Sequence, residues 1–337
     1  MSAATVTADH VACFAVRTLR FFLRLLPIRF VVGWPCGSVL HPIARLFLAR
    51  RSQATLEAAW TGLNSERLSD ASLVELVQWS TLHIARTAAI FLRLPLSEEE
   101  LKKYVTIDQA SRVALSEDLE RGGCIIVSAH FGGFELIIPA LLAHLSTSLA
   151  GKEVVVPYKP LHLRHLNDLV LSIRKEISHD RCHFMPSKGS MGVLQSVINR
   201  GGVVGMLPDQ RSTSGSCLLP FLGRQCRCMD GFARLQISTA APVWFVTCEL
   251  TDEHSCSRES GRYDQETCAH VSAFRLCSGS ACDLERGTSA SGISASAAAD
   301  TVSRYNRLLE KAIMRTPCQY LWAHDRWRAK EPCRSPI

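Results

Sequence analysis

Hydrophobic positions change their spacing along the chain, and the change separates a helical part from a mixed part. Between residues 52 and 104 the apolar side chains recur with helical spacing, as at Leu73, Leu76 and Trp79. Ser97 followed by three glutamates is typical of a helix start, because the serine oxygen and a glutamate satisfy free backbone amides. We therefore expect residues 52–104 to form a helical region that packs on a core built by the rest of the chain.

From about residue 107 onward, short apolar runs alternate with helical stretches. The runs predict buried strands at residues 124–128, 153–157, 202–207 and 243–247. Helical patterns cover residues 107–121, 134–148, 163–177, 190–199 and 230–240. Strands that alternate with helices predict an α/β fold with a mixed sheet covered by helices on both faces. We assign this domain to residues 105–330.

Residues 251–300 interrupt the alternation. They are rich in Ser, Ala, Cys and Arg and show little periodicity. We expect a variable, loop-rich region with a strand or two inside it. Beyond it, apolar positions at Tyr305, Leu309 and Ile313 predict a final amphipathic helix.

The first 51 residues form a basic and apolar segment. They hold seven arginines and one acidic residue, Asp9, so their formal charge is +6. Arginines and prolines interrupt the apolar run, whereas a transmembrane helix needs about 20 apolar residues without charge. An interfacial helix or hairpin on anionic lipid fits this composition, with arginines reaching the headgroups. A tilted single span through residues 11–33 and a buried helical hairpin remain open as alternatives.

Charge and cysteine content exclude other classes of protein. The whole chain of 337 residues carries +7, nearly all of it in the first 51 residues, whereas a nucleic-acid-binding protein usually has a basic face across its fold. The 14 cysteines are irregularly spaced, and Cys226 with Cys228 forms a CxC element without a matching His or Cys pair. We therefore expect reduced thiols, no metal site and no nucleic-acid partner.

The segment from Ser128 to Glu135, with the sequence SAHFGGFE, holds the strongest candidate for catalysis. It follows a predicted strand and precedes a predicted helix, which is where reactive groups meet ligands in α/β sheets. His130 is the expected general base, and the glycine turn is expected to bring the Glu135 carboxylate back to the imidazole. Such a pair removes a proton from a hydroxyl that then attacks a thioester. The oxyanion would be stabilised by backbone amides around Gly132 and Gly133 or by a basic side chain.

Five ordered motifs resemble the late acyltransferases of lipid A biosynthesis, a family that also includes enzymes acylating mannosylated phosphatidylinositol. The His-x4-Glu element from His130 is the first, and Tyr158-Lys159-Pro160 is the second. An arginine in the next helix, Arg174, comes third. The last two comprise Leu207-Pro208-Asp209-Gln210 with Pro220-Phe221-Leu222-Gly223, and the segment Pro317 to Arg326.

The resemblance implies a glycerolipid-acyltransferase-like fold and a set of binding residues. Arg174 is expected to bind phosphate through its fork of donors, and Lys159 and Arg164 are weaker candidates for the same role. Tyr158 belongs to the same expected binding set. Asp209 has three open readings: it orients Arg174, it binds the acceptor sugar, or it forms a turn. His324 and Arg326 are expected to close the site or contact lipid phosphate.

The implied reaction moves a fatty acyl chain from acyl carrier protein, or acyl-CoA, to a hydroxyl of a membrane glycolipid. A lipid A precursor is the first candidate acceptor, and the expected location is the cytoplasmic face of the bacterial inner membrane, peripheral or single-span. No metal or organic cofactor is implied. A mannosylated phosphoinositide, another glycolipid or a lysophospholipid is an alternative acceptor, and an inactive lipid-binding module is an alternative of another class. A serine hydrolase is disfavoured because no GxSxG element is present.

Overall fold

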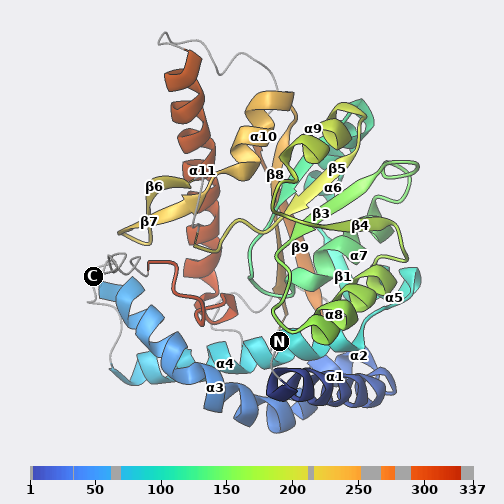
Figure 1. Cartoon of the computed structure of the whole chain (residues 1–337), viewed down its shortest axis with the longest axis vertical. Helices are drawn as coiled ribbons and strands as arrows, with labels where there is room; N and C mark the ends of the chain where they lie inside the picture. Colours follow the sequence, from blue (N-terminus) through green and yellow to red (C-terminus); the bar gives the residue numbers. More distant parts are fainter. Residues whose placement is uncertain are drawn as a thin grey trace.

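A computed structural model describes residues 3–32, 34–61, 70–211, 216–251, 267–277 and 290–327. In this part of the chain a seven-stranded sheet forms the centre, in the order β1–β9–β8–β2–β5–β3–β4, with a two-stranded hairpin beside it (Figure 1). The strands are β1 (Val105–Ile107), β2 (Cys124–Val127), β3 (Val154–Tyr158), β4 (Cys182–Pro186), β5 (Val203–Met206), β6 (Ser216–Phe221), β7 (Arg224–Met229), β8 (Val243–Leu250) and β9 (Ala269–Cys277).

Strand direction places two chain segments at the same edge of the sheet. Strands β2, β3, β4, β5 and β8 are mutually parallel, whereas β9 is antiparallel to β8 and parallel to β1. The sheet is therefore mixed, as expected. Because β2 and β5 are parallel neighbours, the loops that follow their carboxyl ends lie side by side.

Alternate residues of the central strands face two separate cores, so helices cover both faces of the sheet, as the sequence predicts. Cys124 and Ile126 pack with helices α6, α7 and α8, while Ile125 and Val127 pack with α9, α10 and α11. These helices are α6 (Gln109–Arg121), α7 (Ile137–His144), α8 (Arg164–Ile177), α9 (Met191–Asn199), α10 (Gly231–Thr239) and α11 (Ala290–Arg315).

Of the remaining helices, the first four gather at one end of the molecule, and the last packs against α7 and β1 (Figure 1). They are α1 (Ala3–Arg24), α2 (Ile28–Val32), α3 (Trp34–Thr61), α4 (Asp70–Arg93) and α5 (Glu98–Tyr104), and Ser97 caps α5 as predicted. Helix α4 contacts two short 3₁₀ helices, η1 (Phe134–Leu136) and η3 (Pro317–Gln319). The Thr87 hydroxyl of α4 also donates to the Gly132 carbonyl at 3.1 Å. Helix α4 therefore forms one wall beside the loop after β2.

Polar contacts join α1 to α8, and they leave the opposite face of α1 exposed. The buried carboxylate of Asp9 accepts hydrogen bonds from the backbone amides of His165 and Leu166. Arg20 and Arg24 both pair with Glu176. In the described part of the chain, no helix combines the length and the apolar character that crossing a membrane requires.

Several elements differ from those predicted. Helix α11 begins at Ala290, inside the region expected to be loops, because alanine favours helix even where serines obscure the periodicity. Strand β9 is the strand expected there, and residues 252–266 and 278–289 lie outside the described residues. Strands β1 and β4 and the β6–β7 hairpin were not predicted. Strand β1 is only three residues long, and β4 has no continuous apolar run.

The loop after β2 requires glycine at position 132. Gly132 has φ +60°, and a Cβ there would lie 1.9 Å from the carbonyl oxygen of Cys248 on β8. The neighbouring amide of Gly133 donates to that same carbonyl at 2.7 Å. The loop therefore approaches β8 as closely as a backbone without a side chain allows.

Gly132→Ala is expected to lower the free energy of unfolding by more than Gly151→Ala. Gly151 is the matched control, because it has φ +70° but nothing within 4 Å of its Cβ position. The control isolates the backbone cost of about 1–2 kcal/mol, and Gly132→Ala adds the clash to it. Urea denaturation of both variants measures the difference, and equal destabilisation would contradict the close approach to β8.

Candidate active site

His130 lies in the loop that follows β2, and the C-terminal segment holds this loop in place. The amide of Leu321 donates to the His130 carbonyl at 3.0 Å, and the amide of Gly132 donates to the Gln319 carbonyl at 2.9 Å. The segment of Gln319 and Leu321 thus holds the backbone of the His130 loop, although nearly 190 residues separate the two in sequence. The imidazole is consequently presented from a rigid support.

Asp209 follows β5 and forms two hydrogen bonds with His130. Its Oδ1 lies 2.9 Å from the His130 Nδ1, and its Oδ2 accepts the His130 backbone N–H at 3.0 Å. The carboxylate is only 3% exposed. Because an ionised carboxylate only accepts, it places the imidazole proton on Nδ1 and leaves Nε2 as the free base. This arrangement is that of a general base with its orienting acid.

Electrostatics strengthen the pair. Burial alone would lower the pKa of His130, but the charge and hydrogen bond of Asp209 and the charge of Glu135 raise it above 6.5. Burial alone would raise the pKa of Asp209, but its contacts with His130 hold it below 3.8. The ionised Asp209 therefore favours a protonated His130, so an imidazolium at this position is stabilised relative to one in water.

Glu135 does not take the position expected from the sequence. It stands in η1, and its Oε1 accepts from the Arg174 Nη2 of α8 at 2.9 Å. The expectation that Glu135 orients the imidazole is therefore wrong for this geometry, because Asp209 already occupies Nδ1. The chain turns into η1 directly after the glycines, and this turn directs Glu135 towards α8. Asp209 lies in the turn after β5, as one of its three readings expected, but its carboxylate binds His130 and not Arg174.

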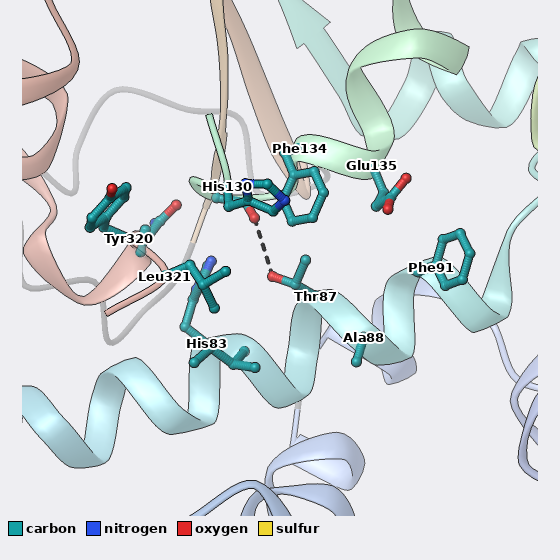
Figure 2. A pocket seen from close by; sticks show the side chains of 12 residues that line it. His83, Thr87, Ala88, Phe91, His130, Phe134, Glu135, Tyr320 and Leu321 are labelled. Atoms are coloured by element: carbon teal, nitrogen blue, oxygen red, sulfur yellow. Dashed lines mark hydrogen bonds between the residues drawn. The ribbon is translucent and has the colours of Figure 1, made fainter. Parts of the chain in front are cut away.

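A cavity of about 200 Å³ opens beside His130 and Glu135. Figure 2 shows its wall of side chains, with His83, Thr87, Ala88 and Phe91 rising from α4. Most lining groups are apolar, so the cavity suits a hydrocarbon group next to the imidazole. The lining residues are His83, Ile84, Thr87, Ala88, Phe91, His130, Gly132, Phe134, Glu135, Gln319, Tyr320 and Leu321.

Helix α4 supplies site residues that the sequence reasoning missed. His83, Thr87 and Phe91 are four residues apart, so they share one face of the helix. Burial above all, then the charge of Arg86, lowers the pKa of His83 to about 3, although a backbone hydrogen bond to Gly132 opposes the shift. His83 is therefore neutral at any physiological pH. The sequence offered one sign of this role: His83 and Thr87 are polar residues four positions apart on an otherwise apolar face of the helix.

Three expected binding residues lie away from the cavity wall. Tyr158 ends β3 and is half-buried, while Lys159 and Arg164 are exposed between β3 and the start of α8. None of them is among the cavity-lining residues. They lie at or after the carboxyl end of β3, which is the parallel neighbour of β5, so they lie at the edge of the sheet that carries Asp209 but outside the cavity wall.

The two C-terminal candidates support other residues. The His324 Nε2 accepts the backbone N–H of Arg211 at 3.0 Å, so His324 holds the loop that carries Asp209. Arg326 is 1% exposed and donates to Asn306 at 2.8 Å. The expectation that Arg326 contacts lipid phosphate is wrong, because a buried guanidinium cannot reach a headgroup.

The expected amide donors for an oxyanion are also occupied. The amides of Gly132 and Gly133 donate to Gln319 and Cys248, and the amide of His130 donates to Asp209. The two glycine amides are therefore not available, which leaves the following amides of the loop or a basic side chain as the oxyanion donor. In the described part of the chain no group of His, Cys, Asp and Glu is arranged to hold a metal ion.

Comparison with known proteins identifies the family. The sequence model of the family described as "Bacterial lipid A biosynthesis acyltransferase" matches residues 69–329. No curated protein sequence gave a significant match. The family match covers well over half of the 337 residues and includes the loops of both His130 and Asp209. The chain therefore belongs to the bacterial lipid A biosynthesis acyltransferase family and is an acyltransferase.

Proposed function

We propose that this acyltransferase moves a fatty acyl chain from a carrier thioester to a hydroxyl of a membrane glycolipid, and that the acceptor is a lipid A precursor. The observation that supports the chemistry is the His130–Asp209 pair beside an apolar cavity. The family match supports the choice of acceptor. In this proposal the acyl chain occupies the cavity, and its thioester lies beside His130, which is one of the lining residues.

The reaction follows from the positions of the protons. The His130 Nε2 removes the proton from the acceptor hydroxyl. The hydroxyl oxygen then attacks the carbonyl carbon of the thioester. Asp209 stabilises the imidazolium that results. When the tetrahedral intermediate collapses, the carbon–sulfur bond breaks and the imidazolium returns its proton to the leaving thiolate. An ester and a free thiol are formed, and the enzyme is regenerated without a covalent intermediate.

We assign the oxyanion contact to a basic side chain, and Arg174 is the candidate. Its carboxylate partner Glu135 lines the cavity, and its guanidinium lies 5.9 Å from the Phe91 ring centre on the cavity wall. Arg174 is 27% exposed, so part of its donor fork remains open to substrate. Glu135 in this scheme orients Arg174 and raises the pKa of His130.

The donor is proposed to be acyl carrier protein, with acyl-CoA as the alternative carrier. Lys159 and Arg164 are exposed beside the site, and an acidic carrier or a pantetheine phosphate would be attracted to them. No cofactor is needed for this reaction, because the thioester itself is the activated group.

The transfer assay tests the proposed function. Purified protein in detergent receives radiolabelled acyl carrier protein and, separately, a lipid A precursor, mannosylated phosphatidylinositol and a lysophospholipid. Label is expected to reach the lipid A precursor, and His130→Ala is expected to lose this transfer by about 10²–10⁴-fold, because the base is gone.

Circular dichroism of the His130→Ala variant controls for folding. If label reached only another acceptor of the panel, that acceptor and not the lipid A precursor would be the substrate. Transfer that continues in His130→Ala would contradict the mechanism, and binding of lipid without transfer to any acceptor would favour the inactive module.

Helix α1 is proposed to rest on the cytoplasmic face of the bacterial inner membrane. Val11, Phe14, Phe21, Phe22 and Leu25 are all exposed by 59% or more. The spacing of the first four places them along one side of α1, opposite Asp9 and the contacts with α8, and Leu25 follows in the turn after the helix. Exposed apolar patches with arginines nearby are typical of an interfacial helix, and a peripheral attachment is therefore favoured over a single span.

Replacing Phe14, Phe21 and Phe22 by Ser is expected to weaken binding to vesicles of phosphatidylglycerol and phosphatidylethanolamine by about tenfold or more. Each aromatic ring loses apolar burial of about 1.5–3 kcal/mol when fully inserted, and 1.4 kcal/mol is tenfold. Vesicle co-sedimentation measures the change. Val113→Ser with Val193→Ser is the matched control, because these exposed residues lie on α6 and α9. Equal loss in both sets, or no loss, would refute attachment through α1.

A further inference from the structure

The guanidinium of Arg326 is buried without a carboxylate partner. In the described part of the chain its Nη2 donates to the Asn306 Oδ1 at 2.8 Å and lies 3.4 Å from the Cys228 Sγ, while no carboxylate forms an ion pair with it. Its Nε and Nη1 have no hydrogen-bond partner. The ring of Phe221 lies 4.0 Å from the guanidinium carbon. An arginine cannot lose its charge in a protein, and the carboxylates within its field, Asp209 and Glu310, form no ion pair with it, so an anion in contact with the guanidinium would offset the cost of its burial.

Two N–H donors and a second sulfur converge on the sulfur of Cys228, which is itself fully buried on β7. The Asn306 Nδ2 lies 3.3 Å from it, and the Arg326 Nη2 and the Cys226 Sγ each lie 3.4 Å from it. The amide of Asn306 cannot be reversed, because its Oδ1 accepts from Arg326 and its Nδ2 also donates to the Pro220 carbonyl. A neutral thiol is a weak acceptor, whereas a thiolate is a strong one.

We propose that Cys228 is a thiolate in the folded protein, that it is the counter-ion of Arg326, and that it acts as a positioning residue for the active site. A neutral Cys228 thiol would donate to the carbonyl of Cys226, which lies 3.7 Å from the sulfur, but it would remain only a weak acceptor for the two N–H groups directed at it. A buried charge is tolerated in a protein when an opposite charge and further hydrogen bonds surround it, and Cys228 and Arg326 would meet both conditions for each other.

The surrounding groups support ionisation at Cys228 and oppose it at Cys226. The hydrogen bond from Cys226, followed by the charge of Arg326 and the hydrogen bond of Asn306, lowers the pKa of Cys228 although burial opposes the shift. The hydrogen bond to Cys228, followed by burial, raises the pKa of Cys226. Because the N–H groups of Arg326 and Asn306 both donate to Cys228, the proposal makes Cys228 the acceptor of the pair and Cys226 the donor.

The ion pair reaches the catalytic residues through Arg326. The charge of Arg326 acts on Asp209, and Tyr305 and Tyr320 also lie within its field. Arg326 belongs to the segment whose Gln319 and Leu321 hold the loop of His130. A thiolate at Cys228 offsets the positive charge near the His130–Asp209 pair and anchors the segment. The kinetic part of this proposal rests on the proposed transfer reaction, whereas the charge of Cys228 does not.

The charge of Cys228 is tested by the ultraviolet absorption of thiolates in the full-length protein. Native protein is expected to show a thiolate band at neutral pH that Cys228→Ser lacks. Cys226→Ser is the matched control, because a serine hydroxyl at position 226 still donates to the sulfur and the band persists. A native spectrum identical to that of Cys228→Ser at neutral pH would overturn the proposal.

The coupling to the active site is tested by the pH profile of kcat/KM for transfer. Without the thiolate, the unbalanced Arg326 disfavours a protonated His130, so the acidic limb of Cys228→Ser moves to lower pH. Cys228→Asp keeps an anion at this position and is expected to restore the native limb. An acidic limb that stays in place in Cys228→Ser would refute the coupling.

Folding provides a second criterion, which thermal melting of the variants measures. If Cys228→Ser does not fold, Cys228→Asp is expected to fold and to melt well above it, because an anion is what Arg326 requires. A Cys228→Asp variant no more stable than Cys228→Ser would overturn the proposal. If no transfer is detected with native protein, the thiolate band and the melting series still decide the charge of Cys228.

Discussion

The site depends on the double hydrogen bond between one carboxylate and one histidine. Asp209 binds both the imidazole and the backbone amide of His130, so it fixes the ring and the loop together. This contact exists only because β2 and β5 are parallel neighbours whose carboxyl ends meet at one edge of the sheet. The pairing of these two strands, each four residues long, is thus what brings Asp209 into contact with His130.

The other elements around the site serve to hold that contact. Strand β8 accepts from the glycine turn, the segment after α11 binds both ends of the His130 loop, and His324 holds the loop of Asp209. Helix α4 closes the cavity and contacts the Gly132 carbonyl. Because each contact uses a backbone group of the loop, little freedom remains for the imidazole, and preorganised catalytic groups need not be reordered during reaction.

The sequence predicted the sheet, its covering helices and the loop of His130, because short apolar runs and a glycine turn are local signals. It did not predict which carboxylate binds His130. Glu135 is close in sequence, whereas Asp209 is 79 positions away and becomes a neighbour only through strand order. The burial of Arg326 was equally hidden, since a basic residue in an aromatic motif has the same pattern whether it faces lipid or the core. His83 and Thr87 could have been noticed in the sequence as two polar residues four positions apart on α4. The role of Phe91 and the cavity itself could be found only from the packed structure.

The central claim is that Asp209, and not Glu135, is the partner of His130, and the transfer assay with two isosteric variants tests it most directly. Asn at position 209 can satisfy only one of the two His130 donors, so the imidazole loses its fixed tautomer. Asp209→Asn is expected to lower kcat/KM by about 10²–10⁴-fold and, because the raised pKa of His130 falls, to move the acidic limb to lower pH. Glu135→Gln keeps an oxygen for Arg174 and is expected to lose far less. The reverse order, with Glu135→Gln inactive and Asp209→Asn nearly native, would contradict this account.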